Sequence, residues 1–220
     1  MQSHLRHRAF KYLAALAIAA SCGALRARPR LLEIPETLVY ELVEAVCDNE
    51  VSWSKDDKRR VLTLLSNDPR EAVRARVARA AVELASDWES DARRLLSKLA
   101  SDSSGSVRAA AMCGLEEVLM RASPIERVEL VCQWAGAPHA AEREAVARAL
   151  CSNISTVVTD LVLQQLSRDH VPAVRTAAVR ATRLHFEENP RTYRELLEER
   201  ATDSNRRVRR VARRMLAELA

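Results

Sequence analysis

The sequence predicts an all-α fold: a right-handed α-solenoid of antiparallel helix pairs, with about five repeats that follow an N-terminal helical cap. Three observations predict it. One motif recurs every 32 to 35 residues, two columns of apolar residues keep the same period, and the composition suits helices, with 48% apolar residues, 30% charged residues and only four glycines. We therefore expect residues 51–220 to form the repeat array, and residues 1–50 to hold a basic and apolar helix followed by a capping helix.

The recurring motif is Asp-x-x-x-x-Val-Arg, and its arginines follow one another at steps of 34, 35, 32 and 34 residues when one degenerate copy is counted. The degenerate copy keeps Arg143 but has Ala137 in place of Asp and Glu142 in place of Val, so we expect looser stacking or a bend in this unit. Each Asp precedes a predicted helix, where its carboxylate can accept N–H bonds from the first turn. The full copies are Asp68/Val73/Arg74, Asp102/Val107/Arg108, Asp169/Val174/Arg175 and Asp203/Val208/Arg209.

The N-terminal segment has a basic stretch followed by a short apolar run that ends at Cys22. We favour a capping helix. The alternative is an export signal within residues 1–22, in which Cys22 would be the lipidated cysteine of a lipoprotein. The run is too short to span a membrane, so membrane association would depend on that lipid anchor.

The second helix of each unit carries one buried stripe. With the motif Arg set to zero, the stripe lies at offsets −1, +3 and +7, and a spacing of four residues places these positions on one helix face. A helix at 35–48 fits the same register one 34-residue step before Arg74. The stripe consists of Val39, Val43, Cys47; Val73, Val77, Ala81; Val107, Ala111, Leu115; Val174, Ala178, Thr182; and Val208, Ala212, Leu216.

The first helix of each unit carries two further columns with the same period, which argues against coincidence. One column is Leu62, Leu96, Val131, Leu163 and Leu197, and the other is Leu65, Leu99, Trp134, Leu166 and Arg200.

Local signals mark several helix starts. Ser123-Pro124-x-Glu126 is a capping box with Pro at the first helical position, and Asn189-Pro190 and Asp68-Pro69 have the same order of cap and proline. Besides 35–48, the predicted helices are 56–66, 70–85, 90–100, 104–120, 124–135, 139–151, 155–167, 171–187, 190–201 and 204–219.

Over residues 56–220 the chain resembles the armadillo-like HEAT-repeat proteins, of the short bacterial kind also found in phycobilin lyase-like proteins. In that family the motif Asp and Arg are implied to form a structural ladder between neighbouring units. The resemblance therefore assigns to architecture Asp68, Arg74, Asp102, Arg108, Asp169, Arg175, Asp203 and Arg209.

Net charge gives little support for nucleic-acid binding. The chain carries +5, but residues 1–30 hold six basic residues and no acidic one. The other 190 residues therefore carry 29 basic and 30 acidic side chains, a net charge of −1.

An arginine row is the first candidate binding surface. Offset +5 lies two residues beyond the buried +3 position, which is a rotation of about 200°, so its side chains should face solvent. Guanidinium forks there could contact an acidic peptide or a phosphate backbone. The alternative is a solvated face with local pairs such as Arg214 with Glu218 and Arg79 with Glu83. The row consists of Arg79, Arg148, Arg180 and Arg214.

The last helix supplies a second candidate, the C-terminal patch. It could bind a phosphate or an acidic partner, but a terminal repeat also needs a polar outer face, and we favour the latter interpretation. The patch consists of Arg206, Arg207, Arg210 and Arg213.

No motif for catalysis is present. The glycines are isolated, so there is no phosphate-binding loop or dinucleotide fingerprint, and there is no Gly-x-Ser-x-Gly turn. The five cysteines are odd in number and scattered, which favours a reducing compartment, and we expect most of them to be buried as small apolar residues. His4-x-x-His7 alone does not predict a metal site. We therefore expect no enzyme activity, no cofactor and no metal.

Three functions remain open. The leading one is a non-catalytic scaffold or adaptor that binds a protein partner, an acidic one if the arginine row is the site, with a cytoplasmic location favoured over export. The second is nucleic-acid binding, by analogy with the alkyl-base DNA glycosylases built from HEAT-like units, with Trp53, Trp88 and Trp134 as candidate aromatic residues. Of these, Trp134 keeps a core column and Trp88 is predicted to lie in a turn. The third is a phycobilin lyase-like cofactor protein.

Overall fold

The structure, a computed structural model, describes residues 35–47, 54–83, 85–151 and 157–219. In this part of the chain it contains eleven α-helices and no strand, which confirms the predicted all-α fold, and each helix has a predicted counterpart. The helices are α2 (Glu36–Cys47), α3 (Lys55–Leu65), α4 (Glu71–Glu83), α5 (Ala85–Leu99), α6 (Gly105–Arg121), α7 (Pro124–Ala135), α8 (Ala140–Leu150), α9 (Thr159–Ser167), α10 (Pro172–His185), α11 (Pro190–Arg200) and α12 (Arg206–Glu218).

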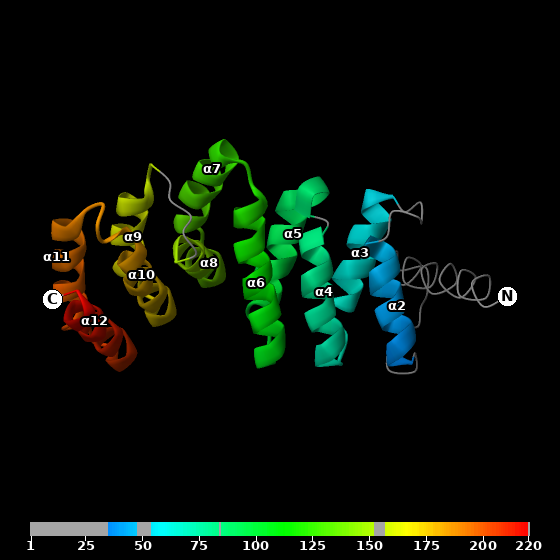
Figure 1. Cartoon of the computed structure of the whole chain (residues 1–220). Helices are drawn as coiled ribbons and strands as arrows, with labels where there is room; N and C mark the ends of the chain where they lie inside the picture. The colour runs from blue at the N-terminus through cyan, green and yellow to red at the C-terminus, as the bar shows by residue number, and fades with distance from the viewer. Residues whose placement is uncertain (1–34, 48–53, 84, 152–156, 220) are drawn as a thin grey trace. The chain divides into compact units, whose positions relative to one another are not determined.

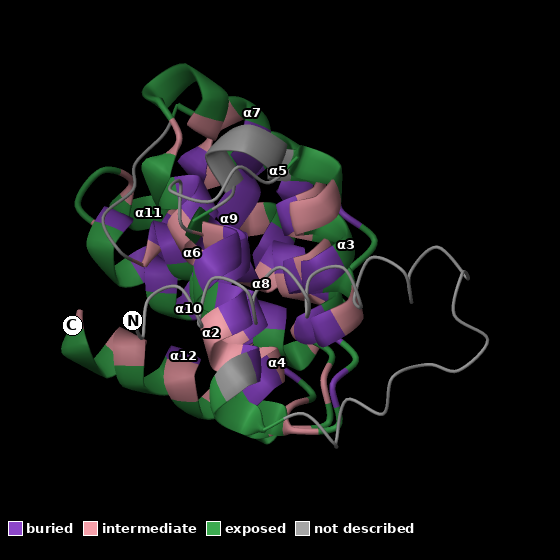
Figure 2. Ribbon diagram, turned by 90° about the vertical axis from the view of Figure 1, so that its right-hand side faces the viewer, coloured by how far each residue is buried: buried purple, intermediate pink, exposed green. Residues whose placement is uncertain are grey.

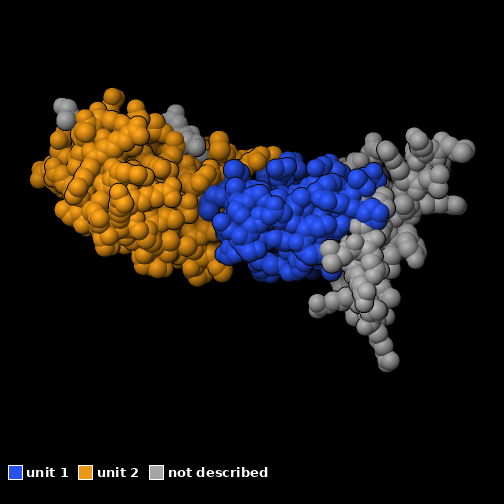
Figure 3. Space-filling model, turned by 90° about the horizontal axis from the view of Figure 1, so that it is seen from below, with its two compact units in different colours: residues 1–114 blue, residues 115–220 orange. Residues whose placement is uncertain are grey.

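Residue contacts divide the chain into two compact units, residues 1–114 and residues 115–220, which Figure 3 colours separately. The division falls inside α6, between Gly114 and Leu115. The boundary predicted near residue 50 lies outside the described residues, as do Cys22 and the predicted N-terminal helix.

In the first unit, α2 packs against α3 and α4, and α4 packs in turn against α3 and α5 (Figure 1). The part of α6 that belongs to this unit approaches α4 and α5 closely at Gly114. A Cβ atom added at Gly114 would lie 2.8 Å from Leu96 Cδ2 and 2.9 Å from Val82 Cγ2.

In the second unit, the helices after Arg121 form two layers (Figure 1). The first helices of the repeats form one layer, in which α9 lies between α7 and α11, and the second helices form the other, in which α10 lies between α8 and α12. Helix α10 also packs against α9 and α11, so it is the central element of this unit.

The predicted apolar columns form the core, and Figure 2 shows the buried residues gathered between the helices. Leu62 of the first column is 1% exposed and its four other members are fully buried. In the second column only Arg200 departs from deep burial, with 14% of its side chain exposed. In the stripe of the second helices, Cys47 and Leu216 are half-buried and the other members are buried.

Helix starts agree only in part with the predicted caps. The capping box is present, since the Glu126 backbone N–H donates to Ser123 Oγ at 3.4 Å and the Ser123 N–H donates to Glu126 Oε2 at 3.0 Å. The side chain of Asn189 does not cap α11, because its amide donates to Asp160 Oδ2. Pro69 is not the first helical residue, because α4 starts at Glu71.

Two helix boundaries differ by four or five residues from prediction. Helix α5 starts at Ala85 instead of residue 90, so Trp88 lies in the helix and not in a turn. No glycine or proline precedes residue 90 in this segment to prevent the earlier start. Helix α9 starts at Thr159 instead of residue 155, after β-branched residues that have low helix propensity.

Candidate functional site

Three motif arginines form a ladder with the Asp of the following repeat: Arg74, Arg143 and Arg175. Within the described residues, Arg108 and Arg209 form no such rung, although both were predicted to belong to the ladder. Ala137 stands where the Asp after Arg108 would be, and Arg209 donates to backbone carbonyls instead. In each rung Nη2 donates to the second carboxylate oxygen, so the contact is the two-pronged geometry that guanidinium and carboxylate favour. The Nε to Oδ2 distances are 2.7 Å for Arg74 and Asp102, 2.6 Å for Arg143 and Asp169, and 2.9 Å for Arg175 and Asp203.

The same residues also close the turn before each second helix. In all five copies the Arg Nη1 donates to the backbone carbonyls six and five residues before it. The Oδ1 of each motif Asp accepts the N–H two residues ahead, which belongs to the residue before the helix and not to its first turn as the sequence suggested. These side chains are therefore occupied by architecture.

Asp68 has no such arginine in the preceding repeat, because Tyr40 occupies the equivalent position. Asp68 instead pairs with Arg70 in its own turn, at 2.8 Å. The guanidinium of Arg76 lies 5.3 Å from the centroid of the Tyr40 ring, in a cation–π arrangement.

The degenerate repeat keeps the rung with the repeat that follows it, but Ala137 has no carboxylate for Arg108 of the repeat before it. Arg143 contacts Asp169 with the same geometry as the full copies, and Ala137 still supplies a backbone carbonyl to Arg143 Nη1 at 2.7 Å. Glu142, which replaces the stripe Val, is only 3% exposed.

Ladder contacts stabilise the ionised carboxylates. The Arg74 hydrogen bond is the main reason that the pKa of Asp102 is below its usual range. For Asp169 and Asp203, burial raises the pKa, but the hydrogen bonds from Arg143 or Arg175 and from a backbone N–H outweigh it, so both pKa values are also lowered.

All four arginines of the arginine row are exposed, and three of them belong to the second unit. Arg214 Nε donates to Glu218 Oε1 at 2.7 Å, which is the local pair considered from the sequence. Arg148 pairs with Glu116 of α6 and lies 4.0 Å from Glu144. Within the described part of the chain, Arg180 has no hydrogen bond or ion pair.

Arg148 and Arg180 line one cavity of about 310 Å³ on the second-helix layer of the second unit, which we call the arginine hollow. Arg207, from the C-terminal patch, joins them there. The two basic features that were separate in the sequence therefore meet across α8, α10 and α12. The other lining residues are Glu116, Glu144, Cys151, Ala173, Thr176 and Ala177.

Burial raises the pKa of two titratable groups that line the hollow, Glu144 and Cys151. Burial raises the pKa of Glu144, against the opposing influence of Arg148, Arg207 and Arg180, and Glu116 adds to the rise. Burial raises the pKa of the Cys151 thiol to about 11, and this thiol donates a weak hydrogen bond to the Ala177 carbonyl at 3.6 Å. Cys151 therefore contributes no negative charge near neutral pH.

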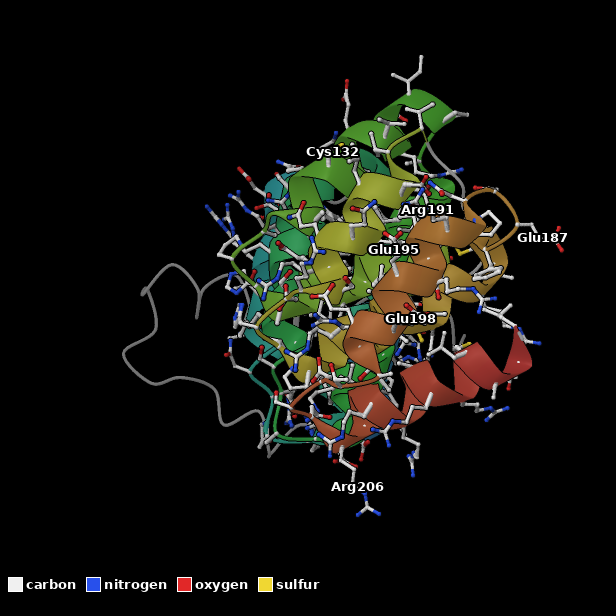
Figure 4. The ribbon with its side chains drawn as sticks, turned by 90° about the vertical axis from the view of Figure 1, so that its left-hand side faces the viewer. Cys132, Glu187, Arg191, Glu195, Glu198 and Arg206 are labelled. Carbon is white, nitrogen blue, oxygen red and sulfur yellow. The ribbon has the colours of Figure 1, made fainter. Side chains whose placement is uncertain are left out.

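The rest of the C-terminal patch is exposed but does not form one site. Arg213 Nε donates to the Ala201 carbonyl at 3.1 Å, so it links α12 to the end of α11. Arg206 extends away from the helices in Figure 4, where α11 shows the mixed charges Arg191, Glu195 and Glu198.

Cys113 and Cys132 are exposed, contrary to the expected burial, and the four cysteines of the described residues are free. Cys113 occupies offset +5, the position of the arginine row, which explains its exposure. Among the described residues no group of three His, Cys, Asp or Glu side chains is arranged to hold a metal ion. The described helices also include none with the length and apolar character needed to cross a bilayer.

Sequence reasoning missed Glu116 and Glu144 in the hollow. The spacing of four residues between Glu144 and Arg148 is a readable signal for a helical ion pair. The pairing of Arg148 with Glu116 has no such signal, since 32 residues separate them and the contact depends on how the helices pack.

Comparison with known proteins supports the fold and leaves the family open. No protein-family model matches the chain, and no curated protein matches it. Among solved structures, the chain is similar to the N-terminal domain of MAST/Orbit, with a TM-score of 0.52, 15% sequence identity, and coverage of 86% of this chain and 94% of that one. An engineered protein is more weakly similar, with a TM-score of 0.43, 18% identity and coverage of 96% and 89%. At this identity the first likeness shows the fold alone: the chain has a helical repeat fold.

Proposed function

We propose that the protein is a non-catalytic scaffold of the HEAT-repeat type that binds an acidic segment of a protein partner on the second-helix layer of the second unit. One observation carries this proposal: Arg180 and Arg207 line a shared hollow, and neither has a hydrogen-bonded or ion-paired side-chain partner in the described part of the chain. An arginine without such a partner can donate two parallel hydrogen bonds to a carboxylate of the partner segment.

Repeat architecture is consistent with this role. The motif residues are engaged in the ladder or in the turns before the second helices, so the side chains that differ between repeats remain to select a ligand. Trp134 is fully buried, which removes it from the aromatic pocket considered for a glycosylase, and Trp53 lies outside the described residues.

The test is binding of fluorescent glutamate-rich peptides, measured by anisotropy. We expect Arg180→Ala/Arg207→Ala to weaken binding about tenfold or more, since two charge-assisted contacts are lost. The control is Arg94→Ala/Arg191→Ala, which removes the same charge from side chains that are 82% and 91% exposed. Equal losses in the two variants would show that net charge, and not the hollow, is responsible.

Nucleic-acid binding is the second candidate, favoured by the exposed arginines of α12. It predicts affinity that falls steeply with salt concentration, because phosphate contacts release counterions. Absence of retention on heparin at low salt would exclude it.

A further inference from the structure

The arginine hollow is small and partly open to solvent, and side chains of α6, α8, α10 and α12 line it. Ala173 and Ala177 of α10 leave space because their side chains are short, and Arg148, Arg180 and Arg207 reach it from α8, α10 and α12. Its volume of about 310 Å³ is at the lower end of the range for ligand pockets, which suits one functional group and not a whole chain.

The charges in the hollow are unequal. Three guanidinium groups face two carboxylates, and both carboxylates lie against the same one, since Arg148 pairs with Glu116 and lies 4.0 Å from Glu144. Within the described residues Arg180 and Arg207 form no ion pair, although the carboxylate of Glu144 interacts with both at longer range. The hydroxyl of Thr176 is also committed, because it donates to the Pro172 carbonyl at 2.7 Å.

Two unpaired guanidinium groups match a dianion better than a single carboxylate. A phosphorylated side chain carries a charge of about −1.5 to −2 near neutral pH and presents three acceptor oxygens, which fit two guanidinium forks. A carboxylate carries one charge and would leave one arginine uncompensated.

We infer that the arginine hollow binds the phosphate monoester of a phosphorylated side chain in the partner segment, with Arg180 and Arg207 as its ligands. This inference rests on the proposed function and specifies the chemistry that the site selects. A nucleic-acid backbone fits less well, because each phosphodiester carries a single charge and would compensate only one of the two arginines.

Glu144 gives the inference a readout that a purely structural role would not produce. Its carboxyl group lies on the hollow among Arg148, Arg180, Arg207 and Glu116, and 25% of its side chain is exposed. A bound dianion would be repelled by this carboxylate. Glu144→Gln removes the charge and keeps the shape, so we expect it to tighten phosphopeptide binding.

The experiment uses the full chain and three immobilised peptide mixtures with randomised flanking residues and a central phosphoserine, glutamate or serine. We expect the phosphoserine mixture to bind at least about tenfold more tightly than the glutamate mixture. Arg180→Ala/Arg207→Ala should remove this preference, while Arg94→Ala/Arg191→Ala should keep it. Free inorganic phosphate should compete, and circular dichroism should show unchanged helix content in every variant.

The other outcomes are distinct. Equal binding of the glutamate and phosphoserine mixtures, with the same loss in Arg180→Ala/Arg207→Ala, would overturn the phosphate inference and leave the scaffold proposal intact. Binding of neither mixture would overturn both. Binding of single-stranded DNA with the same dependence on Arg180 and Arg207 would assign the hollow to nucleic acid.

Discussion

Arg175 illustrates at the scale of one residue how this chain uses its repeated motif. It donates to both carboxylate oxygens of Asp203 and to the backbone carbonyls of Asp169 and His170. Only 9% of its side chain and 3% of that of Asp203 are exposed. Because water is largely excluded, the charge of Arg175 is compatible with this position only while its partners are present.

We therefore expect Asp203→Ala to lower the free energy of unfolding by about 3–5 kcal/mol, since it leaves a buried guanidinium without its counter-ion. Urea denaturation followed by circular dichroism measures this change. Arg191→Ala, at a side chain that is 91% exposed, should cost less than about 0.5 kcal/mol. If Asp203→Ala lost as little stability as Arg191→Ala, the contact between Arg175 and Asp203 would not stabilise the fold.

At the scale of the element, α6 approaches its neighbours in the first unit closely at Gly114. A Cβ atom at Gly114 would come within 3.0 Å of atoms of Leu96 and Val82, whose side chains are buried, and Val82 is β-branched and cannot easily rotate away. The other second helices described have Ala, Met or, in α2, Val at the equivalent offset, so the glycine reflects local packing and not a rule of the repeat.

Gly114→Ala should therefore destabilise the protein although alanine is the better helix former. Overpacking of a core costs about 1–3 kcal/mol, and the gain in helix propensity is about 1 kcal/mol, so we expect a net loss of about 1 kcal/mol. Gly136→Ala is the matched control, because the nearest atom to its added Cβ would be 4.0 Å away. A rise in the urea midpoint of Gly114→Ala would contradict the close packing of α6.

How far the sequence predicts these elements depends on the range of the interactions. The period and the stripes predicted all eleven described helices and the buried columns, because those features are set by helical spacing within one repeat. The start of α5 was wrong because no local breaker defines it. The arginine hollow was not predicted, because it depends on which side chains of α8, α10 and α12 converge after packing.

At the scale of the whole molecule, ladder carboxylates occur in both compact units: Asp102 in the first, and Asp169 and Asp203 in the second. Stability in repeat proteins is approximately a sum of repeat and nearest-neighbour terms, so each rung should contribute separately. The ladder thus links a property of single residues to the pH dependence of the entire fold.

The folded-state pKa of all three aspartates is lowered. Their contribution to stability is therefore fully present above the unfolded pKa of about 3.9, and it is lost as the pH falls through the lower folded-state values. The free energy of unfolding is measured by urea titration at successive pH values. We expect the contribution of the three aspartates to be nearly constant from about pH 6 to pH 5 and to fall steeply below about pH 4.

Asp102→Asn and Asp203→Asn should each be less stable at neutral pH. Each should also lose less stability in acid, because asparagine has no carboxyl group to take up a proton. The double variant should lose less still. An acid profile of the double variant that ran parallel to that of the unmodified chain would show that other carboxylates, and not the ladder, govern the stability in acid.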